Sequence, residues 1–309
     1  MKVNIAIYDR SCRYENKHTD GDNIEYEAQL SHDKYYTINL KVNAIMITVI
    51  IHTRNEEKNI QACINSAKIL SDTIVVIDME STDTTSHIVQ QNKVKLVSFP
   101  FSHYVEPARA FGIEQATSPW VMILDADERV TSKLAQEIKT IVLTERAPSQ
   151  PTHYYIPRKN IFGNTTCLPA GRWLKHGGWW PDKQIRFINK SFLKEWPSHI
   201  HSTPVMDGSH GTLKNSIEHY FHGDLEDMVK KTIVYEDIES DLLLQAKRPV
   251  SVITFFRKFI GELNRRLIIK MGFLDGSIGA IESMYQAYSK TITYLFLYEK
   301  YYHKKSSTV

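Results

Sequence analysis

Two aspartates at the end of an apolar segment are the clearest candidates for chemistry in this chain. The apolar residues 120–124 lead directly into Asp125-Ala126-Asp127-Glu128-Arg129. Because alternate residues of an extended segment point to the same side, Asp125 and Asp127 are expected to converge on one spot. Paired carboxylates suit Mg²⁺ or Mn²⁺, with phosphate oxygens completing the shell. A solvated acidic turn before a helix near Thr131 is the simpler alternative.

The segments around this pair predict a doubly wound α/β sheet. Continuous apolar runs rich in β-branched residues cover residues 45–53, 73–78, 94–99 and 120–124, as expected for parallel strands buried on both faces. Apolar residues at helical spacing lie between and after them: Ile60, Cys63, Ile64 and Ala67, then Ile113 and Ala116, then Leu134, Ile138 and Val142. Such sheets bind ligands beyond the carboxyl ends of their strands.

Polar residues follow three of these predicted strands. Residues 53–56 (TRNE) follow the first, Asp78 ends the second, and the aspartate pair follows the fourth. These ends are expected to share one edge of the sheet. The chain has no glycine-rich phosphate loop, which argues against an ordinary dinucleotide or P-loop site.

Composition and patterning divide the chain into four segments. With 309 residues, 42% hydrophobic and 24% charged, it can bury a sizeable core. Residues 1–43 form an extension without a motif, 44–146 the α/β half, 147–222 an aromatic-rich half, and 223–309 a helical region. Four of the five tryptophans lie in 147–222, which indicates a wall for a flat or polyhydroxylated substrate or, equally, a packed core.

The C-terminal region is basic and predicts an anionic partner. From Lys247 to Lys305 there are eleven Lys/Arg against four Asp/Glu, whereas the net charge of the whole chain is only +3. One helical stripe contains Ile281, Tyr285, Tyr288, Ile292 and Leu295. We expect either an interfacial helix on an anionic membrane or a helix docked on its own domain. No nucleic-acid module is present, so no nucleic-acid partner is expected.

The cysteines and the apolar runs predict the cellular setting. Three scattered cysteines without metal-ligand spacing indicate a reducing compartment. The N-terminus lacks a signal-peptide pattern, and no apolar run approaches 18 residues. A cytoplasmic protein, peripheral on the inner face of the cytoplasmic membrane, is expected.

The order of motifs resembles family 2 inverting glycosyltransferases. The resemblance covers roughly residues 44–300 and rests on TRNEE, IDMESTDTT, VEPARAFGI, WVMILDADERV, HGGWWPDKQIRF, EHY and GFLDG, in that order. It is nearest to the branch of lipopolysaccharide-core glucosyltransferases. It implies a GT-A fold, in which a Rossmann-like nucleotide-sugar-binding half precedes an acceptor-binding half. It also implies inverting transfer of a hexose, with a divalent metal, from a nucleoside diphosphate sugar, usually UDP-linked.

The resemblance also implies roles for individual residues. The donor would contact Thr53, Asn55, Glu56, Asp78, Asp83, Arg109, Asp125 and Ala126. The metal, Mg²⁺ or Mn²⁺, would be held by Asp127, with Asp125 and His219. The acceptor would lie beside His176, Trp179 and Trp180.

The general base that deprotonates the acceptor hydroxyl is expected to be Asp182, with His201 as the second choice. The branch commonly has VHE where this chain has Ile200-His201-Ser202, so a glutamate is missing at Ser202. Ala110 and Thr84 also depart from the family pattern. A non-catalytic nucleotide-sugar-binding or scaffold homologue is therefore the alternative function. A nucleotidyltransferase is a third hypothesis, against which the missing glycine-rich loop argues.

Overall fold

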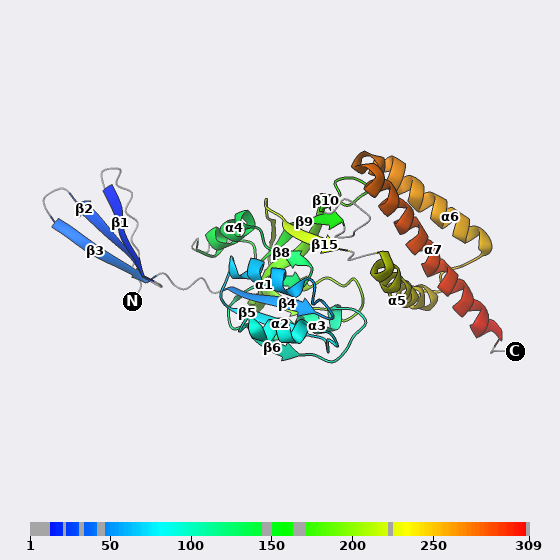
Figure 1. Ribbon diagram of the computed structural model, residues 1–309, viewed down its shortest axis with the longest axis horizontal. Helices are drawn as coiled ribbons and strands as arrows, with labels where there is room; N and C mark the ends of the chain where they lie inside the picture. Colours follow the sequence, from blue (N-terminus) through cyan, green and yellow to red (C-terminus); the bar gives the residue numbers. More distant parts are fainter. Residues whose placement is uncertain are drawn as a thin grey trace. The chain divides into compact units, whose positions relative to one another are not determined.

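The computed structural model describes residues 13–20, 23–30, 34–41, 47–143, 150–162, 171–221 and 225–306. The chain divides into two compact units, Met1–Met46 and Ile47–Val309. The first unit contains the antiparallel strands β1 (Arg13–Asp20), β2 (Asn23–Leu30) and β3 (Lys34–Lys41) (Figure 1). The predicted extension thus includes a three-stranded sheet that the sequence analysis did not anticipate.

The second unit is built on one mixed sheet whose first part is parallel. The order is β6 (Lys95–Ser98), β5 (Ile74–Asp78), β4 (Ile47–Thr53) and β7 (Trp120–Asp125). All four predicted strands are present. Strands β4 and β5 are buried at every position, and β7 at all but its last, which explains their uninterrupted apolar sequences.

The sheet continues past β7 into the aromatic-rich half. Strand β11 (Asp182–Asn189) pairs antiparallel with β7, and then follow β9 (His153–Phe162), β15 (Ile217–Phe221) and β8 (Glu128–Arg129). Short strands β10 (Arg172–Trp173) and β14 (His210–Thr212) also pair with β9. The pair β12 (Leu193–Glu195) and β13 (Val205–Met206) is separate, and η1 (Lys190–Phe192) is a 3₁₀ turn.

Four helices accompany the parallel strands: α1 (Ile60–Lys68), α2 (Thr85–Gln91), α3 (Glu106–Glu114) and α4 (Ser132–Leu143). The predicted apolar face of α1 is buried at Ile60, Cys63, Ile64 and Ala67. Ile113 of α3 packs with Ile50 and Ile123 in the main core. The predicted alternation of strands and helices is therefore confirmed.

Strand register places the polar strand ends on one edge. Thr53 of β4 pairs with Asp78 of β5, and His52 pairs with Asp125 of β7. Since the three strands are parallel, their carboxyl ends meet at the same edge of the sheet. This edge positions the candidate site.

The C-terminal region is a set of packed helices: α5 (Leu225–Gln245), α6 (Val252–Leu263), the π-helix η2 (Asn264–Ile269), the 3₁₀ turn η3 (Gly272–Asp275) and α7 (Gly276–Ser306). Helix α7 packs on both α5 and α6 (Figure 1). Tyr285 of the predicted stripe bonds the Met228 carbonyl of α5 at 2.8 Å. Ile281 and Ile292 of the stripe are also half-buried, whereas Tyr288 and Leu295 are exposed, so only part of the stripe is docked on the domain. Across the described helices, none combines the length and apolar character that crossing a membrane requires.

Candidate active site

Asp125 is neutralised by two arginines at the end of β7. Its Oδ1 lies 2.7 Å from Arg109 and its Oδ2 lies 2.6 Å from Arg186 of β11. Burial alone would raise the pKa of Asp125, but the two guanidinium groups hold it well below its usual range. Because both oxygens already accept charged hydrogen bonds, the geometry gives Asp125 the role of anchoring the arginines.

The two aspartates do not converge as expected. Residues 126–127 form a turn between β7 and β8, so the extended geometry on which that prediction depended ends at Asp125. The backbone N–H of Ala126 donates to the His52 carbonyl at 3.1 Å, which fixes the turn against β4. Asp127 consequently faces different partners from Asp125.

Asp127 faces His219 of β15 in an arrangement suited to a cation. Asp127 Oδ2 lies 3.4 Å from His219 Nε2, and His219 Nδ1 lies 2.6 Å from Asn160 Oδ1. An amide oxygen only accepts, so Nδ1 carries a proton and Nε2 is the ring nitrogen that faces the carboxylate. Although burial opposes ionisation, His219 lowers the pKa of Asp127.

Two buried oxygens at this edge have no partner. Within the described ranges, Asp127 Oδ1 and Thr53 Oγ1 are buried without a hydrogen bond. Buried polar atoms are usually paired, so these two indicate a ligand at the site. No three His, Cys, Asp or Glu side chains among the described residues are grouped to hold a metal by themselves. Asp127 and His219 would fit a divalent ion whose shell is completed by ligand oxygens.

Helix α5 brings two further groups to this edge. Lys231 Nζ lies 3.7 Å from Glu56 Oε1. Burial, followed by the charge of Asp127, raises the pKa of Glu56. Burial, followed by the charges of Glu106, Asp125 and Asp127, raises the pKa of Tyr235 to about 12. Lys231 and Tyr235, which sequence analysis did not identify, therefore lie within electrostatic range of the strand-end carboxylates.

The predicted nucleotide pocket is a hydrogen-bonded pair of loops after β4 and β5. Asn55, at φ +50°, accepts from the Thr82 N–H at 2.7 Å, and Asp78 accepts from the hydroxyl of Ser86 at 2.6 Å. Asp83 accepts from the backbone N–H groups of Glu57 and Thr85 at 3.2 and 2.9 Å. Despite some desolvation, the bonds from Thr85 lower the pKa of Asp83. The structure thus brings Asn55, Asp78 and Asp83 together.

Arg109 is positioned by His52 beneath the site. His52 Nε2 lies 3.1 Å from the Ala108 carbonyl, so Nε2 carries the proton and Nδ1 accepts from Arg109 Nη1 at 3.2 Å. Burial and Arg109 together lower the pKa of His52 to about 3, which keeps the ring neutral. A Cβ on Gly112 would lie 2.7 Å from His52 Nε2, so only glycine leaves room for this ring.

The geometry argues against Asp182 as the general base. Its Oδ2 accepts from Arg158 at 2.7 Å and from Asn160 at 3.1 Å, and its Oδ1 accepts from Gln184 at 2.8 Å. These bonds outweigh the burial and lower the pKa of Asp182. A carboxylate held so firmly in its ionised form is a weak proton acceptor at neutral pH.

The second candidate, His201, lies beside a carboxylate from another segment. The backbone N–H of His201, at φ +59°, donates to Glu106 Oε1 at 2.8 Å. Glu106 is in the first turn of α3, and no partner for its Oε2 is found among the described residues. Ser202 donates to the Pro197 carbonyl. Glu106 therefore places a carboxylate next to the turn in which the family pattern has its glutamate.

The predicted acceptor residues contact the C-terminal helices. His176 Nδ1 lies 2.8 Å from Asp275 Oδ1, while Asp275 Oδ2 accepts from the backbone N–H of His176 at 2.8 Å. Trp179 packs on Phe221 with ring centroids 4.9 Å apart, and the Trp180 ring lies 5.1 Å from that of Trp173. Both tryptophans are half-buried, so packing is at least part of their role.

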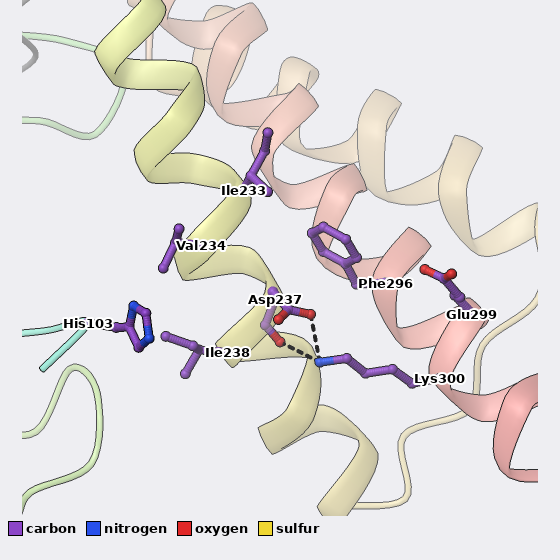
Figure 2. Close-up of a pocket in the computed structure, with 8 residues that line it drawn as sticks. All are labelled: His103, Ile233, Val234, Asp237, Ile238, Phe296, Glu299 and Lys300. Carbon is purple, nitrogen blue, oxygen red and sulfur yellow. Dashed lines mark hydrogen bonds and ion pairs between the residues drawn. The ribbon is translucent and has the colours of Figure 1, made fainter.

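A separate cavity of about 420 Å³ lies between α5, α7 and the loop before α3. Figure 2 shows Lys300 directed at Asp237, whose carboxylate lies 2.8 Å from its ammonium group. None of the predicted site residues lines this cavity. Because its lysine is already paired, it offers no free cation for a diphosphate.

Sequence reasoning missed the buried charges of the second half-sheet. Glu128 is fully buried and accepts from Arg186 at 2.9 Å, and it lies 3.4 Å from Arg158. Asn160, also fully buried, joins His219 to Asp182. The apolar run in residues 185–188, interrupted only by Arg186, is the signal that would have indicated a buried strand carrying a charge.

Comparison with known proteins shows which proteins this chain is similar to. Residues 48–166 match the family model of Glycosyl transferase family 2. An uncharacterised glycosyltransferase of Rickettsia typhi is 26% identical over 256 residues, covering 79% of this chain and 84% of the relative. The lipopolysaccharide core biosynthesis glycosyltransferase LpsC of Rhizobium meliloti is 24% identical over 257 residues, covering 80% and 90%.

Among solved structures, the mannosyltransferase PcManGT from Pyrobaculum calidifontis, in complex with GDP-Man and Mn²⁺, aligns with a TM-score of 0.44 at 14% identity, covering 78% of this chain and 73% of that one. The chain is an α/β protein, and its polar site lies at the carboxyl edge of the parallel strands. Residues 48–166 are similar to family 2 glycosyltransferases, and the predicted family resemblance and GT-A class of fold are confirmed.

Proposed function

We propose that this protein is an inverting, metal-dependent hexosyltransferase that uses a nucleoside diphosphate sugar, UDP-linked, as donor. The observation that carries the proposal is the strand-edge site, where Asp127 and His219 face each other at 3.4 Å. Two buried oxygens at this site have no hydrogen-bond partner among the described residues. Thr53 and Asp127 of this site lie within the matched family 2 segment, and His219 lies beyond it in the sequence. Asp127 and His219 would hold Mg²⁺ or Mn²⁺, which would neutralise the diphosphate leaving group.

The remaining residues of the edge would bind and orient the donor. Asn55, Asp78 and Asp83 form the loops that would take the nucleotide, together with Thr53, Glu56 and Ala126. Arg109 would support the site through Asp125, to which it is bonded at 2.7 Å. Lys231 would contribute positive charge near the diphosphate, because it lies within electrostatic range of Glu56 and Asp127.

The acceptor would be a glycan of the lipopolysaccharide core or another cell-surface, lipid-linked glycan. The similarity to LpsC, whose name refers to lipopolysaccharide core biosynthesis, supports this class. The acceptor would approach the loop containing His176, Trp179 and Trp180. Such substrates would place the reaction at the inner face of the cytoplasmic membrane.

The base would come from the pair His201 and Glu106. Glu106 has an oxygen free of hydrogen bonds to the described residues, whereas Asp182 is fully engaged with Arg158, Asn160 and Gln184. The expected result is that Glu106→Gln lowers kcat by ~10²-fold or more and removes the acid limb of its pH profile. A wild-type pH profile for Glu106→Gln would reject this assignment.

The test of the proposed function is nucleoside diphosphate release by the purified protein. UDP-, GDP- and dTDP-sugars would be supplied with Mg²⁺, Mn²⁺ or EDTA. We expect one of these donors to release its nucleoside diphosphate, and we expect EDTA to abolish that release.

The second candidate function, a non-catalytic nucleotide-sugar-binding homologue, is favoured by Ser202, whose hydroxyl is bonded to a carbonyl. Metal-dependent donor binding without turnover, in the presence of glycan acceptors, would identify that homologue.

A further inference from the structure

The segment from α6 to η3 exposes an unusual number of large apolar side chains. Phe256 and Ile260 are each 61% exposed, and Ile253 is 72% exposed. The whole set, here named the α6–η3 face, consists of Val252, Ile253, Phe256, Ile260, Ile268, Ile269, Met271, Phe273 and Leu274. Isolated exposed apolar residues are ordinary, but nine large ones within residues 252–274 indicate an interaction site.

This face lies on the side of α6 away from its neighbour in the fold. Phe255 packs against Tyr298 of α7, with ring centroids 5.5 Å apart, and Lys258 lies over the Tyr294 ring at 4.6 Å. Residues 252, 256 and 260 recur every four positions, so they share one side of the helix, and each is more than half exposed. Figure 1 shows α6 beside α7, with α5 on the other flank of α7. The described helices therefore leave this face uncovered.

The basic residues around the α6–η3 face indicate an anionic partner. Residues 247–270 contain seven Lys/Arg and one acidic residue, Glu262. Arg248, Arg257 and Lys270 are exposed. A helix with an apolar face flanked by basic residues is suited to the boundary between anionic headgroups and acyl chains. A second copy of this chain fits poorly, because association through this face would oppose two clusters of like charge.

The same segment holds the loop predicted to bind the acceptor. The Gly177 N–H donates to the Lys270 carbonyl at 2.8 Å, and Arg266 donates to the Gly177 carbonyl at 3.2 Å. Asp275, the last residue of η3, holds His176. A surface seated on the α6–η3 face would therefore lie next to residues 175–180.

We propose that the α6–η3 face docks on an anionic lipid bilayer and presents the loop at residues 175–180 to a lipid-linked acceptor. The second clause rests on the proposed function, whereas the docking itself does not. The apolar side chains would enter the interface, while the basic residues would pair with headgroup phosphates. This location differs from the α7 stripe predicted from sequence, because α7 is packed between two helices.

The test is vesicle co-sedimentation of the full chain. Vesicles of phosphatidylethanolamine with phosphatidylglycerol would be compared with phosphatidylcholine alone, at low and high salt. Binding to the anionic vesicles only, weakened by salt, is expected. The double variant Phe256→Glu with Ile260→Glu should bind at least ~10-fold more weakly, because both side chains would otherwise be buried in the interface. Ile69→Glu, at an apolar position 43% exposed beside α1, is the matched control.

Donor hydrolysis in solution separates this proposal from the proposed function. Both variants should hydrolyse the donor at the wild-type rate, since neither position lies at the strand-edge site. Vesicle binding without any donor turnover would reject the presentation of an acceptor to residues 175–180 but would support the docking surface. Equal binding by the double variant and the wild type, or no binding by either, would overturn the proposal. A wild-type dimer that the double variant converts to a monomer, without vesicle binding, would assign the face to self-association instead.

Discussion

Asp125 and Asp127 are two residues apart, yet the structure predicts opposite consequences of neutralising them. Asp125→Asn removes the charge that balances Arg109 and Arg186, which are 5% and 7% exposed. Breaking a buried ion pair from one side costs about 3–5 kcal/mol. Because the Asp125 side chain is 26% exposed, we expect the lower end, about 3 kcal/mol. For a domain of this size, that loss lowers Tm by roughly 6–12 °C.

Asp127→Asn should leave the fold intact and abolish metal-dependent turnover. Asp127 has one weak ionic contact, to His219 at 3.4 Å, and a buried oxygen without a partner among the described residues. It also raises the pKa of Glu56, so its removal relieves a repulsion. The expected change in unfolding free energy is below about 1 kcal/mol.

The assay combines thermal melting with titration of Mn²⁺ in the presence of the nucleoside diphosphate. Asp125→Asn should melt early, and at a temperature below its Tm it should retain a Mn²⁺ response. Asp127→Asn should melt like the wild type and lose that response by ~10-fold or more. Equal melting temperatures for the two variants, or loss of the Mn²⁺ response only in Asp125→Asn, would refute the division of roles.

Three further predictions concern the support of the site. Gly112→Ala should destabilise the protein by about 1–3 kcal/mol in chemical denaturation, because its Cβ would lie 2.7 Å from His52. The pKa of His52 in the folded protein is lowered to about 3, so the unfolded chain binds a proton at this residue at higher pH than the folded chain does. The free energy of unfolding should therefore fall by roughly 1.4 kcal/mol per pH unit as pH drops from 6.5 toward 3. His52→Gln should make the free energy of unfolding depend less steeply on pH, and an unchanged dependence would contradict this prediction. Lys231→Met should raise the donor KM by ~10-fold with kcat nearly unchanged, whereas Lys230→Met, one position away on α5, should not.

The parallel half of the sheet was predictable because its signal is local. Residues 47–51 and 74–77 are apolar at every position but Thr48, and a strand covered on both faces favours that composition. The polar ends at Thr53 and Asp78 were predictable for the same reason, since parallel strands end on one edge. These features depend on short segments of sequence, so no distant contact was needed to foresee them.

The partners of the carboxylates were not predictable, because they come from distant strands. Asp125 is held by Arg186, which lies 61 positions later on a strand beyond the parallel half. The turn at residues 126–127 sends Asp127 toward His219 instead. Sequence spacing alone implied convergence of the two aspartates, whereas the turn and the pairing of β11 beside β7 give them different partners.

The C-terminal helices show a different limit. The α7 stripe and the α6–η3 face are both apolar and lie in a basic region, so their sequences do not tell which one packs inward. Tyr285 is bonded to α5 at 2.8 Å, whereas Phe256 is 61% exposed. Which amphipathic helix keeps an exposed apolar face depends on how the three helices pack against one another. That arrangement is a property of the tertiary structure.

A continuous chain of buried and half-buried charges links the carboxyl edge of the parallel strands to β9 and β11, and it limits what mutagenesis at Asp182 can mean. Asp125 bonds Arg186 at 2.6 Å, Arg186 bonds Glu128 at 2.9 Å, Arg158 lies 3.4 Å from Glu128, and Arg158 bonds Asp182 at 2.7 Å. Asp182→Asn would leave Arg158 with one carboxylate partner fewer and would disturb this chain. Turnover would then fall whether or not Asp182 accepts the proton. A loss of activity at Asp182 therefore identifies a base only if the acid limb of the pH profile disappears while Tm stays at its wild-type value.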